Sequence, residues 1–223
     1  MTTVRVVTID GPSGSGKGTL GQLLAGRLGW GFLDSGALYR ILGVAALRRG
    51  LDEGAAELAQ LAKTLDVIFA QDRILLDGTD VTGEIRTEVV GNLASKVAAL
   101  PEVRTALLAR QRAFAQPPGL VADGRDMGTV VFPSAQVKIF LTASPEERAK
   151  RRYNQLKEKG LNASLPNLAA AIRERDERDR TRSVAPLKAA VTALAVESTG
   201  HSVEEVFGQV LERVLTTFPD LRA

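Results

Sequence analysis

VRVVTIDGPSGSGKGT, residues 4–19, is the stretch that decides how this chain folds. Its first half is rich in valine and isoleucine, the pattern of a strand buried on both faces, and Asp10 closes that strand. The glycines of its second half let successive backbone N–H groups turn inward and form a nest for phosphate oxygens. Lys17 adds a positive charge where we expect a helix to begin, and the helix N-terminus presents free N–H groups to the same anion. The stretch therefore predicts an anion-binding loop between a strand and a helix.

This loop is close to the P-loop pattern G-x-x-x-x-G-K-[ST] but departs from it at one position. Gly18 stands where the pattern has a hydroxyl residue, and Thr19 comes one place later. The form GPSGSGKGT instead resembles the loop of nucleoside monophosphate kinases, in which ATP phosphates and waters hold the metal more than a loop hydroxyl does. A glycine-rich turn with an incidental lysine is the alternative, but the flanking strand and helix supply the context that the motif requires.

Length and composition indicate one sizeable domain. At 223 residues the chain can bury a full hydrophobic core, and we expect a single domain over residues 1–223. It contains no cysteine, which excludes disulfides and thiolate metal sites. The N-terminus lacks the basic and apolar segments of a signal peptide, and no apolar run is as long as a membrane span. We therefore expect a cytoplasmic protein that does not bind membranes.

The charge balance argues against a nucleic-acid partner. Lys and Arg number 29 against 26 Asp and Glu, and the arginines are interleaved with acids. A surface that follows single-stranded nucleic acid combines a basic groove with stacking aromatic side chains, whereas aromatic residues make up only 4% of this chain. Small anionic ligands fit this composition better.

A second candidate anion site follows the short apolar run at residues 30–33. The sequence DSG at 34–36 opens a helix with Ser35 at its start and with Tyr39 and Arg40 about one turn later. A hydroxyl, a phenol and a guanidinium group can then converge on an anion. An N-capped helix with a solvated arginine explains the same residues equally well.

The middle of the chain has a different pattern. Between residues 65 and 81, apolar residues alternate with polar ones, and turn signals stand at Gln71-Asp72 and Asp77-Gly78. This pattern predicts a small antiparallel unit of two or three strands.

Two helices are expected next, at residues 88–98 and 102–115, and Ser95 and Arg104 lie near their junction. Because these elements interrupt a chain of alternating strands and helices, residues 63–115 are predicted to form an inserted lobe.

The parallel-sheet pattern resumes at residues 119–122 and ends in the sequence DGRDMG. Open α/β sheets place their ligand chemistry at the carboxyl ends of buried strands. A structural turn could use the glycines, but it has no need of Asp123, Arg125 and Asp126. Strands are expected at 4–9, 30–33, 119–122, 137–141 and 193–196, which predicts an α/β three-layer P-loop sandwich with a five-stranded parallel sheet.

Two charged helices follow the fourth of these strands. Ser144 begins a capping box, and the helix that it opens carries Arg148 and Arg152 at i and i+4. A polar turn at residues 160–166 joins this helix to the next one. Two charged helices that meet at a flexible tip predict a mobile helical lid over residues 148–172.

The second of these helices, around residues 169–182, mixes arginines with acids, which is usually the pattern of a solvated face. Arg175, Asp179 and Arg182 are nevertheless spaced i, i+4 and i+7, so they share one face and can act together. His201, the single histidine, precedes a capping box, is expected to be exposed and receives no role.

Five separate stretches resemble bacterial cytidylate kinases. They are GPSGSGKGT at 11–19, DSGALYR at 34–40, GEIRT at 83–87, ADGRDMGTVVFP at 122–133 and RERDERDRTR at 173–182. The loop alone is weakly specific, whereas the combination is highly specific and runs from the first strand to the last.

The resemblance implies transfer of the γ-phosphoryl group of ATP, with Mg²⁺, to CMP or dCMP by a monomer. The implied ATP-binding residues are Gly11, Pro12, Ser13, Gly14, Ser15, Gly16, Lys17, Gly18 and Thr19, with Arg148 and Arg152. The implied CMP-binding residues are Ser35, Arg40, Ser95, Arg104, Arg125, Asp126, Arg175, Asp179 and Arg182. Lys17, Arg40, Asp123, Arg125 and Arg182 are the implied catalytic residues, with Asp123 acting on the metal through water.

By the same resemblance, Ser35 lies in the acceptor pocket, and Arg40, Arg125 and Arg182 grip the CMP phosphate. Ser95, Arg104 and Asp126 read cytosine, while Arg175 and Asp179 address the sugar. The chemistry agrees, because the exocyclic amine of cytosine suits a carboxylate and its acceptors suit an arginine. The acceptor phosphate is already ionised at neutral pH, so no general base is needed.

Two other functions share parts of this pattern. One is a related small-molecule kinase that acts on another nucleotide or on a metabolite hydroxyl. A hydroxyl acceptor needs a carboxylate base, and Asp34 or Asp123 could serve as one. A nucleotide-dependent switch protein would use the loop to hold ATP or GTP, but it needs neither a second anion site nor a charged lid.

Overall fold

The computed structural model describes residues 4–51, 56–70, 73–158 and 160–222. The chain divides into two compact units, one made of Met1–Leu33 with Phe114–Ala223 and the other of Asp34–Ala113. The turn predicted at Gln71-Asp72 lies outside the described residues.

The first unit is built on the predicted five-stranded sheet. Its strands are β1 (Arg5–Asp10), β2 (Gly31–Asp34), β6 (Gly119–Gly124), β7 (Val137–Thr142) and β8 (Leu194–Glu197), in the order β2-β6-β1-β7-β8. β1 pairs in parallel with β6 and with β7, and β7 pairs in parallel with β8. The α/β P-loop fold class is thereby confirmed.

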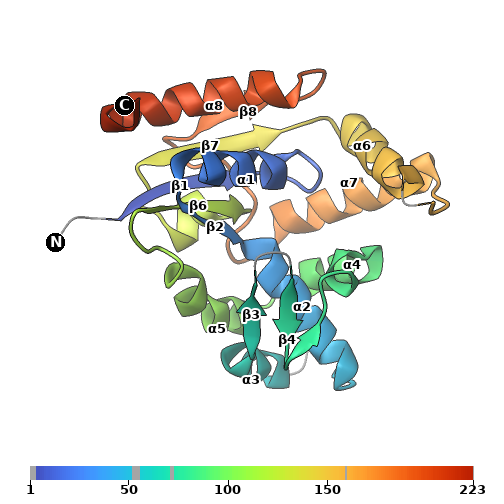
Figure 1. The fold of residues 1–223 in the computed structure, drawn as a ribbon. Coiled ribbons are helices and arrows are strands. Elements are labelled where there is room, and N and C mark those ends of the chain that lie inside the picture. Colours follow the sequence, from blue (N-terminus) through green and yellow to red (C-terminus); the bar gives the residue numbers. More distant parts are fainter. Residues whose placement is uncertain (1–3, 52–55, 71–72, 159, 223) are drawn as a thin grey trace. The chain divides into compact units, whose positions relative to one another are not determined.

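Four α-helices and two short turns complete this unit. They are α1 (Lys17–Leu28), η2 (Met127–Val131), α6 (Pro145–Glu158), α7 (Leu165–Thr181), α8 (Val203–Thr217) and η3 (Pro219–Arg222). Figure 1 shows β1 leading through a short loop into α1, and α6 and α7 lying against each other as a hairpin.

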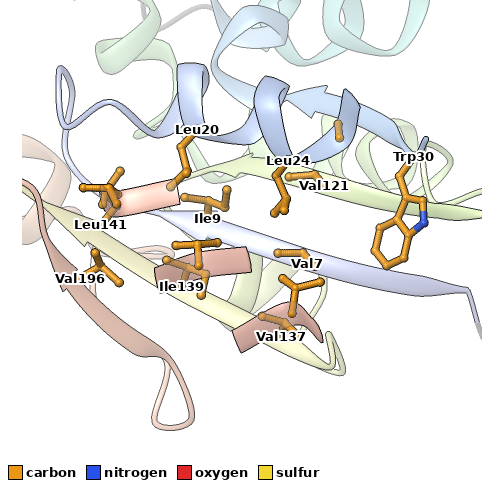
Figure 2. Close-up of a cluster of buried hydrophobic side chains, with 14 of the residues drawn as sticks. Val7, Ile9, Leu20, Leu24, Trp30, Val121, Val137, Ile139, Leu141 and Val196 are labelled. Atoms are coloured by element: carbon orange, nitrogen blue, oxygen red, sulfur yellow. The ribbon is translucent and has the colours of Figure 1, made fainter. Parts of the chain in front are cut away.

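The hydrophobic core of this unit lies between the sheet and the pair α1 and α8. Figure 2 shows Leu20 and Leu24 of α1 above Val7 and Ile9 of β1. Because successive strand residues point to opposite faces, the side chains of Thr8 and Asp10 lie on the other face of β1, where η2 packs. Val7 and Ile9 thus face the apolar core, whereas Thr8 and Asp10 face the segment that follows β6.

The register of the sheet brings two chemically rich segments to one edge. Asp10, the last residue of β1, stands opposite Gly124 of β6 and Phe140 of β7. The loop after β1 and the charged segment after β6 therefore begin at the same level of the sheet, at its carboxyl edge, as the sequence predicts.

The second unit contains a small antiparallel sheet and several helices. Its elements are α2 (Ser35–Arg48), α3 (Ala56–Thr64), β3 (Val67–Phe69), β4 (Ile74–Leu76), β5 (Thr79–Asp80), η1 (Glu84–Arg86), α4 (Glu88–Val97) and α5 (Pro101–Arg112). β4 pairs antiparallel with both β3 and β5, which confirms the predicted antiparallel unit. α3 packs on α5, and α2 packs on α4. The helix α3 has no counterpart in the sequence prediction.

Candidate functional site

The loop between β1 and α1 is folded so tightly that only glycine fits at two of its positions. A Cβ atom on Gly11 would lie 2.0 Å from the carbonyl oxygen of Leu141, and Gly16 has a left-handed backbone with φ of +94°. Lys17 is buried and its Nζ donates to the carbonyl of Pro12 at 3.1 Å, so the lysine folds back across the loop. The loop thus has the nest geometry that the sequence predicts.

The position of Asp123 explains the departure from the P-loop pattern at Gly18. A Cβ atom on Gly18 would lie 3.3 Å from Oδ2 of Asp123, a buried carboxylate at the end of β6. The other oxygen of that carboxylate lies 3.8 Å from Nζ of Lys17. A carboxylate from β6 therefore lies close to the place where a loop hydroxyl would point, and a side chain at position 18 would crowd it.

A pocket of about 550 Å³ opens beside this loop. Its lining includes loop residues 14–19, and Arg148 and Arg152 of α6. The segment that joins β8 to α8 completes the wall with Ser198, His201, Ser202 and Val203. From the sequence, this segment was predicted only to begin a helix with the capping box at Ser202, and no ligand-binding role was assigned to it.

Arg148 is almost completely buried and ties three parts of the unit together. Its guanidinium group forms a two-pronged ion pair with Asp176 of α7, at 3.0 Å and 2.5 Å. It also donates to the carbonyl of Ser13 in the loop at 3.0 Å, and its Nε donates to the carbonyl of Ala143. Arg148 therefore anchors α6 and α7 to the anion-binding loop, besides lining the pocket.

Arg151 forms a second anchor, which the sequence analysis missed. Its Nη1 donates to the carbonyl of Ser15 at 3.3 Å and to Oγ of Ser198, while its Nη2 donates to the carbonyl of Ser198 at 2.7 Å. Oγ of Ser198 also donates to the carbonyl of Ser15 at 3.0 Å. The loop and the segment after β8 are thereby fixed to each other on one side of the pocket.

The arginines of α7 and of the segment after β6 meet around Asp179. Nε of Arg125 donates to Oδ2 of Asp179 at 2.9 Å, and Nη2 of Arg182 lies 3.5 Å from Oδ1 of Asp126. Burial alone raises the pKa of the Asp179 carboxyl, but the positive charges of Arg125, Arg175 and Arg182 outweigh it and hold that pKa below its usual range. The three guanidinium groups are thus close enough to act on one carboxylate, and Arg125 joins the predicted face of Arg175, Asp179 and Arg182 from outside the helix.

Arg175 and Arg182 differ in how the structure holds them. Arg175 lies within α7, and its Nη1 reaches Oγ of Ser13 in the loop at 3.4 Å. Arg182 follows the last helical residue and donates from Nε to the carbonyl of Ala185 at 2.6 Å. The face shared by Arg175, Asp179 and Arg182 therefore extends one residue past the end of α7, which is Thr181.

Asp10 is buried at the end of β1, and it was not among the predicted site residues. It accepts hydrogen bonds from the backbone N–H groups of Met127 and Gly128, both at 2.8 Å. Burial raises the pKa of its carboxyl to about 6, although the two backbone hydrogen bonds oppose this rise. The nearby charge of Asp126 raises this pKa further, whereas that of Arg125 lowers it.

Ser35 and Arg40 lie on α2 in the second unit. Asp34 caps this helix by accepting from the N–H of Ala37 at 3.0 Å, and Ser35 is buried in its first turn. Nη1 of Arg40 donates to the carbonyl of Ile85 at 2.7 Å, and a Cβ atom on Gly91 would lie 3.2 Å from both terminal guanidinium nitrogens. A glycine in α4 thus leaves the space that the Arg40 head occupies.

Ser95 and Arg104 lie on α4 and α5 of the second unit, and both are buried. Nη1 of Arg104 donates to the carbonyl of Ala98 at 3.1 Å, and its guanidinium group lies 5.7 Å from the centre of the Tyr39 ring. A buried arginine on an aromatic face has a fixed orientation.

Among the described residues, no group of three or more His, Cys, Asp or Glu side chains is placed to hold a metal ion. None of the helices in the described part of the chain is both long enough and apolar enough to span a membrane.

Comparisons with known proteins point to one family. A family model described as cytidylate kinase matches residues 7–216. A cytidylate kinase from Aeromonas salmonicida (strain A449) is 61% identical over 211 residues, 92% of each chain. A cytidylate kinase from Stutzerimonas stutzeri (strain A1501) is 61% identical over 218 residues, 95% of each chain. A gluconokinase from Sinorhizobium meliloti 1021 has a TM-score of 0.50 at 16% identity, covers 100% of this chain and 98% of its own, and supports the fold alone.

The Arg148–Asp176 pair predicts a large loss of stability when it is broken. Asp176→Ala leaves a buried guanidinium charge without its partner, so we expect the free energy of unfolding in urea to fall by about 3 to 5 kcal/mol. Glu177→Ala on the same helix removes the exposed pair with Arg180 and should change the free energy of unfolding by less than about 1 kcal/mol. Equal effects of the two variants would show that the buried pair does not anchor α7.

The raised pKa of Asp10 predicts a pH-dependent difference in stability between the wild type and Asp10→Asn. Since the carboxyl titrates at about 6 when folded and at its ordinary 3.8 when unfolded, its ionisation favours the unfolded chain. The stability that the protonated carboxyl provides is complete below pH 3.8 and is lost as the pH rises through 6. Urea unfolding from pH 4 to 7 should therefore show the wild type losing about 2 kcal/mol relative to the variant. A constant difference between the two proteins would contradict the raised pKa.

Proposed function

The chain belongs to the cytidylate kinase family, and on that premise we propose that it transfers the γ-phosphoryl group of ATP to CMP or dCMP, giving ADP with CDP or dCDP. The observation that carries the proposal is the arrangement at one edge of the sheet. An anion-binding loop with Lys17 and Asp123 is followed there by Arg125, Arg175 and Arg182 gathered around Asp179. Two phosphate-bearing substrates need such a pair of positive regions.

The donor half uses the loop and its pocket. The backbone N–H groups of the loop and Nζ of Lys17 bind the ATP phosphates, and the pocket of about 550 Å³ beside them takes the rest of the donor nucleotide. Mg²⁺ supplies positive charge between the two substrates when it is bound. Asp123 suits a role in ordering its water ligands, because its buried carboxylate stands beside Gly18 and Lys17 where the common P-loop hydroxyl is absent.

The acceptor half uses the arginines. Arg125 and Arg182, with Arg40, bind the phosphate of CMP, and Arg175 and Asp179 bind its sugar. Ser35 belongs to the same acceptor pocket. Carboxylates hold the partly buried Arg125 and the buried Arg182 in place, so little reorganisation is needed when the phosphate enters.

Cytosine is assigned to Ser95, Arg104 and Asp126. A carboxylate accepts from the exocyclic amine of cytosine, and a guanidinium group donates to its ring acceptors. Uracil carries a carbonyl in place of the amine, so it would set an acceptor against Asp126. Arg104 is held in one orientation by Tyr39 and the carbonyl of Ala98, which suits base recognition.

The transfer itself needs no general base, because the attacking oxygen belongs to an ionised phosphate. The protein's contribution is to place two anions in line and to offset their charge with Lys17 and the arginines. The two substrates are small nucleotides, and we propose that the enzyme acts as a monomer in the cytoplasm.

Two segments are proposed to move during the reaction. Residues 63–115 form the inserted lobe that binds the nucleoside monophosphate, and residues 148–172 form the lid. The bond from Arg148 to the loop makes the start of α6 the fixed end of this lid, and we infer that residues 160–164 form its mobile tip. Closure would exclude water, which otherwise accepts the phosphoryl group.

Arg182→Ala should separate turnover from donor binding. Loss of one guanidinium group from the acceptor phosphate should lower kcat/KM for CMP by at least about 100-fold, while the Kd for ATP measured without CMP changes less than about twofold. Arg180→Ala, an exposed neighbour paired with Glu177, is the control and should keep both values. Unchanged turnover in Arg182→Ala would remove this residue from the acceptor site.

Asp126→Asn should reduce the preference for cytosine. An amide can donate to uracil where the carboxylate cannot, so the ratio of kcat/KM for CMP to that for UMP should fall by about 5-fold to 150-fold. The wild type should use CMP and dCMP far better than UMP and should leave shikimate unreacted. An unaltered ratio in the variant would exclude Asp126 from base recognition, and comparable wild-type rates with shikimate would favour a hydroxyl acceptor.

A further inference from the structure

Both carboxylate oxygens of Asp10 accept hydrogen bonds from the backbone of one distant segment. It is the last residue of β1, and its side chain lies on the opposite face from Val7 and Ile9, which Figure 2 shows in the hydrophobic core. Oδ1 accepts from the N–H of Met127 and Oδ2 accepts from the N–H of Gly128. The carboxylate thus holds two successive peptide groups 117 and 118 residues away.

These two peptide groups come directly after Arg125 and Asp126. The carbonyl of Asp126 accepts from the N–H groups of Val130 at 2.9 Å and Val131 at 3.2 Å, within the single π-helical turn η2. The N–H on the other side of the same peptide bond belongs to Met127 and donates to Asp10. The peptide group that links Asp126 to Met127 is therefore held at both its oxygen and its nitrogen.

The segment also lies unusually close to β1. A Cβ atom on Gly128 would stand 2.8 Å from Oγ1 of Thr8 and 3.3 Å from Oδ2 of Asp10. Such distances leave no room for any side chain at this position. The close approach lets both backbone N–H groups reach Asp10, and it restricts where Arg125 and Asp126 can point.

Folding stability alone does not favour a carboxylate at position 10. Burial penalises its ionised form, as the pKa of about 6 indicates. The charged groups that face it are Asp126 and Arg125 of the adjoining segment, and on β7 the stem of Lys138 packs near Gly128 while its ammonium group bonds to the carbonyl of Pro133. None of these forms a direct ion pair with Asp10 among the described contacts. A buried, costly carboxylate with two backbone partners is a positioning device.

We propose that Asp10 is a positioning residue for the acceptor nucleotide: it fixes the backbone that carries Arg125 and Asp126, and it takes no part in binding the donor. The proposal rests on the proposed function, since it assigns Arg125 and Asp126 to CMP. The backbone of Asp10 itself is held on both sides by β6 and β7, so a change in its side chain leaves the start of the anion-binding loop in place.

Asp10→Asn tests the proposal with almost no change in shape. The amide keeps one acceptor and turns its NH₂ group toward the second backbone N–H, so one hydrogen bond is lost and two donors oppose each other. We expect KM for CMP to rise by about 5-fold to 150-fold and kcat to fall, while the Kd for ATP, titrated without CMP, changes less than about twofold. The ratio of kcat/KM for CMP to that for UMP should fall as well, because Asp126 is displaced.

Thr8→Val is the matched control. Thr8 lies on the same strand and the same face, is equally buried, and its Oγ1 has no hydrogen-bond partner in the described structure. The Thr8→Val enzyme should therefore match the wild type in KM for CMP, in kcat and in ATP affinity.

Gly128→Ala tests the same contact from its other side. The added methyl group pushes the segment away from Asp10. This variant should therefore raise the KM for CMP as Asp10→Asn does, and it should leave the Kd for ATP unchanged. Retained ATP affinity shows that each variant is folded, and if Asp10→Asn does not fold, Gly128→Ala decides the question.

Three results would overturn the proposal: an unchanged KM for CMP in both variants, an equal loss of ATP affinity, or an unchanged preference for CMP over UMP. A wild-type protein without CMP kinase activity would instead refute the proposed function.

Discussion

The structure depends on holding several positive side chains in a buried place before any phosphate arrives. Arg125, Arg182 and Lys17 would repel one another there, and each lies near a carboxylate: Asp179, Asp126 and Asp123 respectively. Each pair offsets part of the cost of burying a charge, and the orientation of each group is set in advance. Binding a phosphate can then exchange one negative partner for another without rebuilding the site.

The remaining anchors bring backbone segments to these charges. Arg148 and Arg151 leave the same face of α6 and bond to the carbonyls of Ser13 and Ser15, so the loop is held from outside as well as by its own turns. Asp10 does the same for the segment after β6. In all three cases a charged side chain binds backbone atoms at the carboxyl edge of the sheet. Buried and partly buried charged groups therefore position short loops in this fold.

What the sequence could predict follows from the range of each interaction. The strand and nest at residues 4–19 are local patterns, and so is the capping box of Ser202 and Glu205, which forms both of its hydrogen bonds. The alternation that gives β3 and β4 is also local. By contrast, the bonds of Arg148 to Asp176, Arg151 to Ser198 and Asp10 to Met127 join residues 28, 47 and 117 positions apart. A single sequence carries no signal for such pairs, so Arg148 was predicted as a lid and ATP-binding residue rather than as an anchor, and Asp10 only as the end of a strand.

The central claim is that guanidinium groups from distant parts of the chain bind one acceptor phosphate. The most direct test is a crystal structure of the protein with CMP and a non-hydrolysable ATP analogue. We expect Arg40, Arg125 and Arg182 each to place a nitrogen within about 3 Å of the CMP phosphate oxygens, with the cytosine amine on Asp126. It is contradicted if the three guanidinium groups point away from one another or if CMP binds elsewhere.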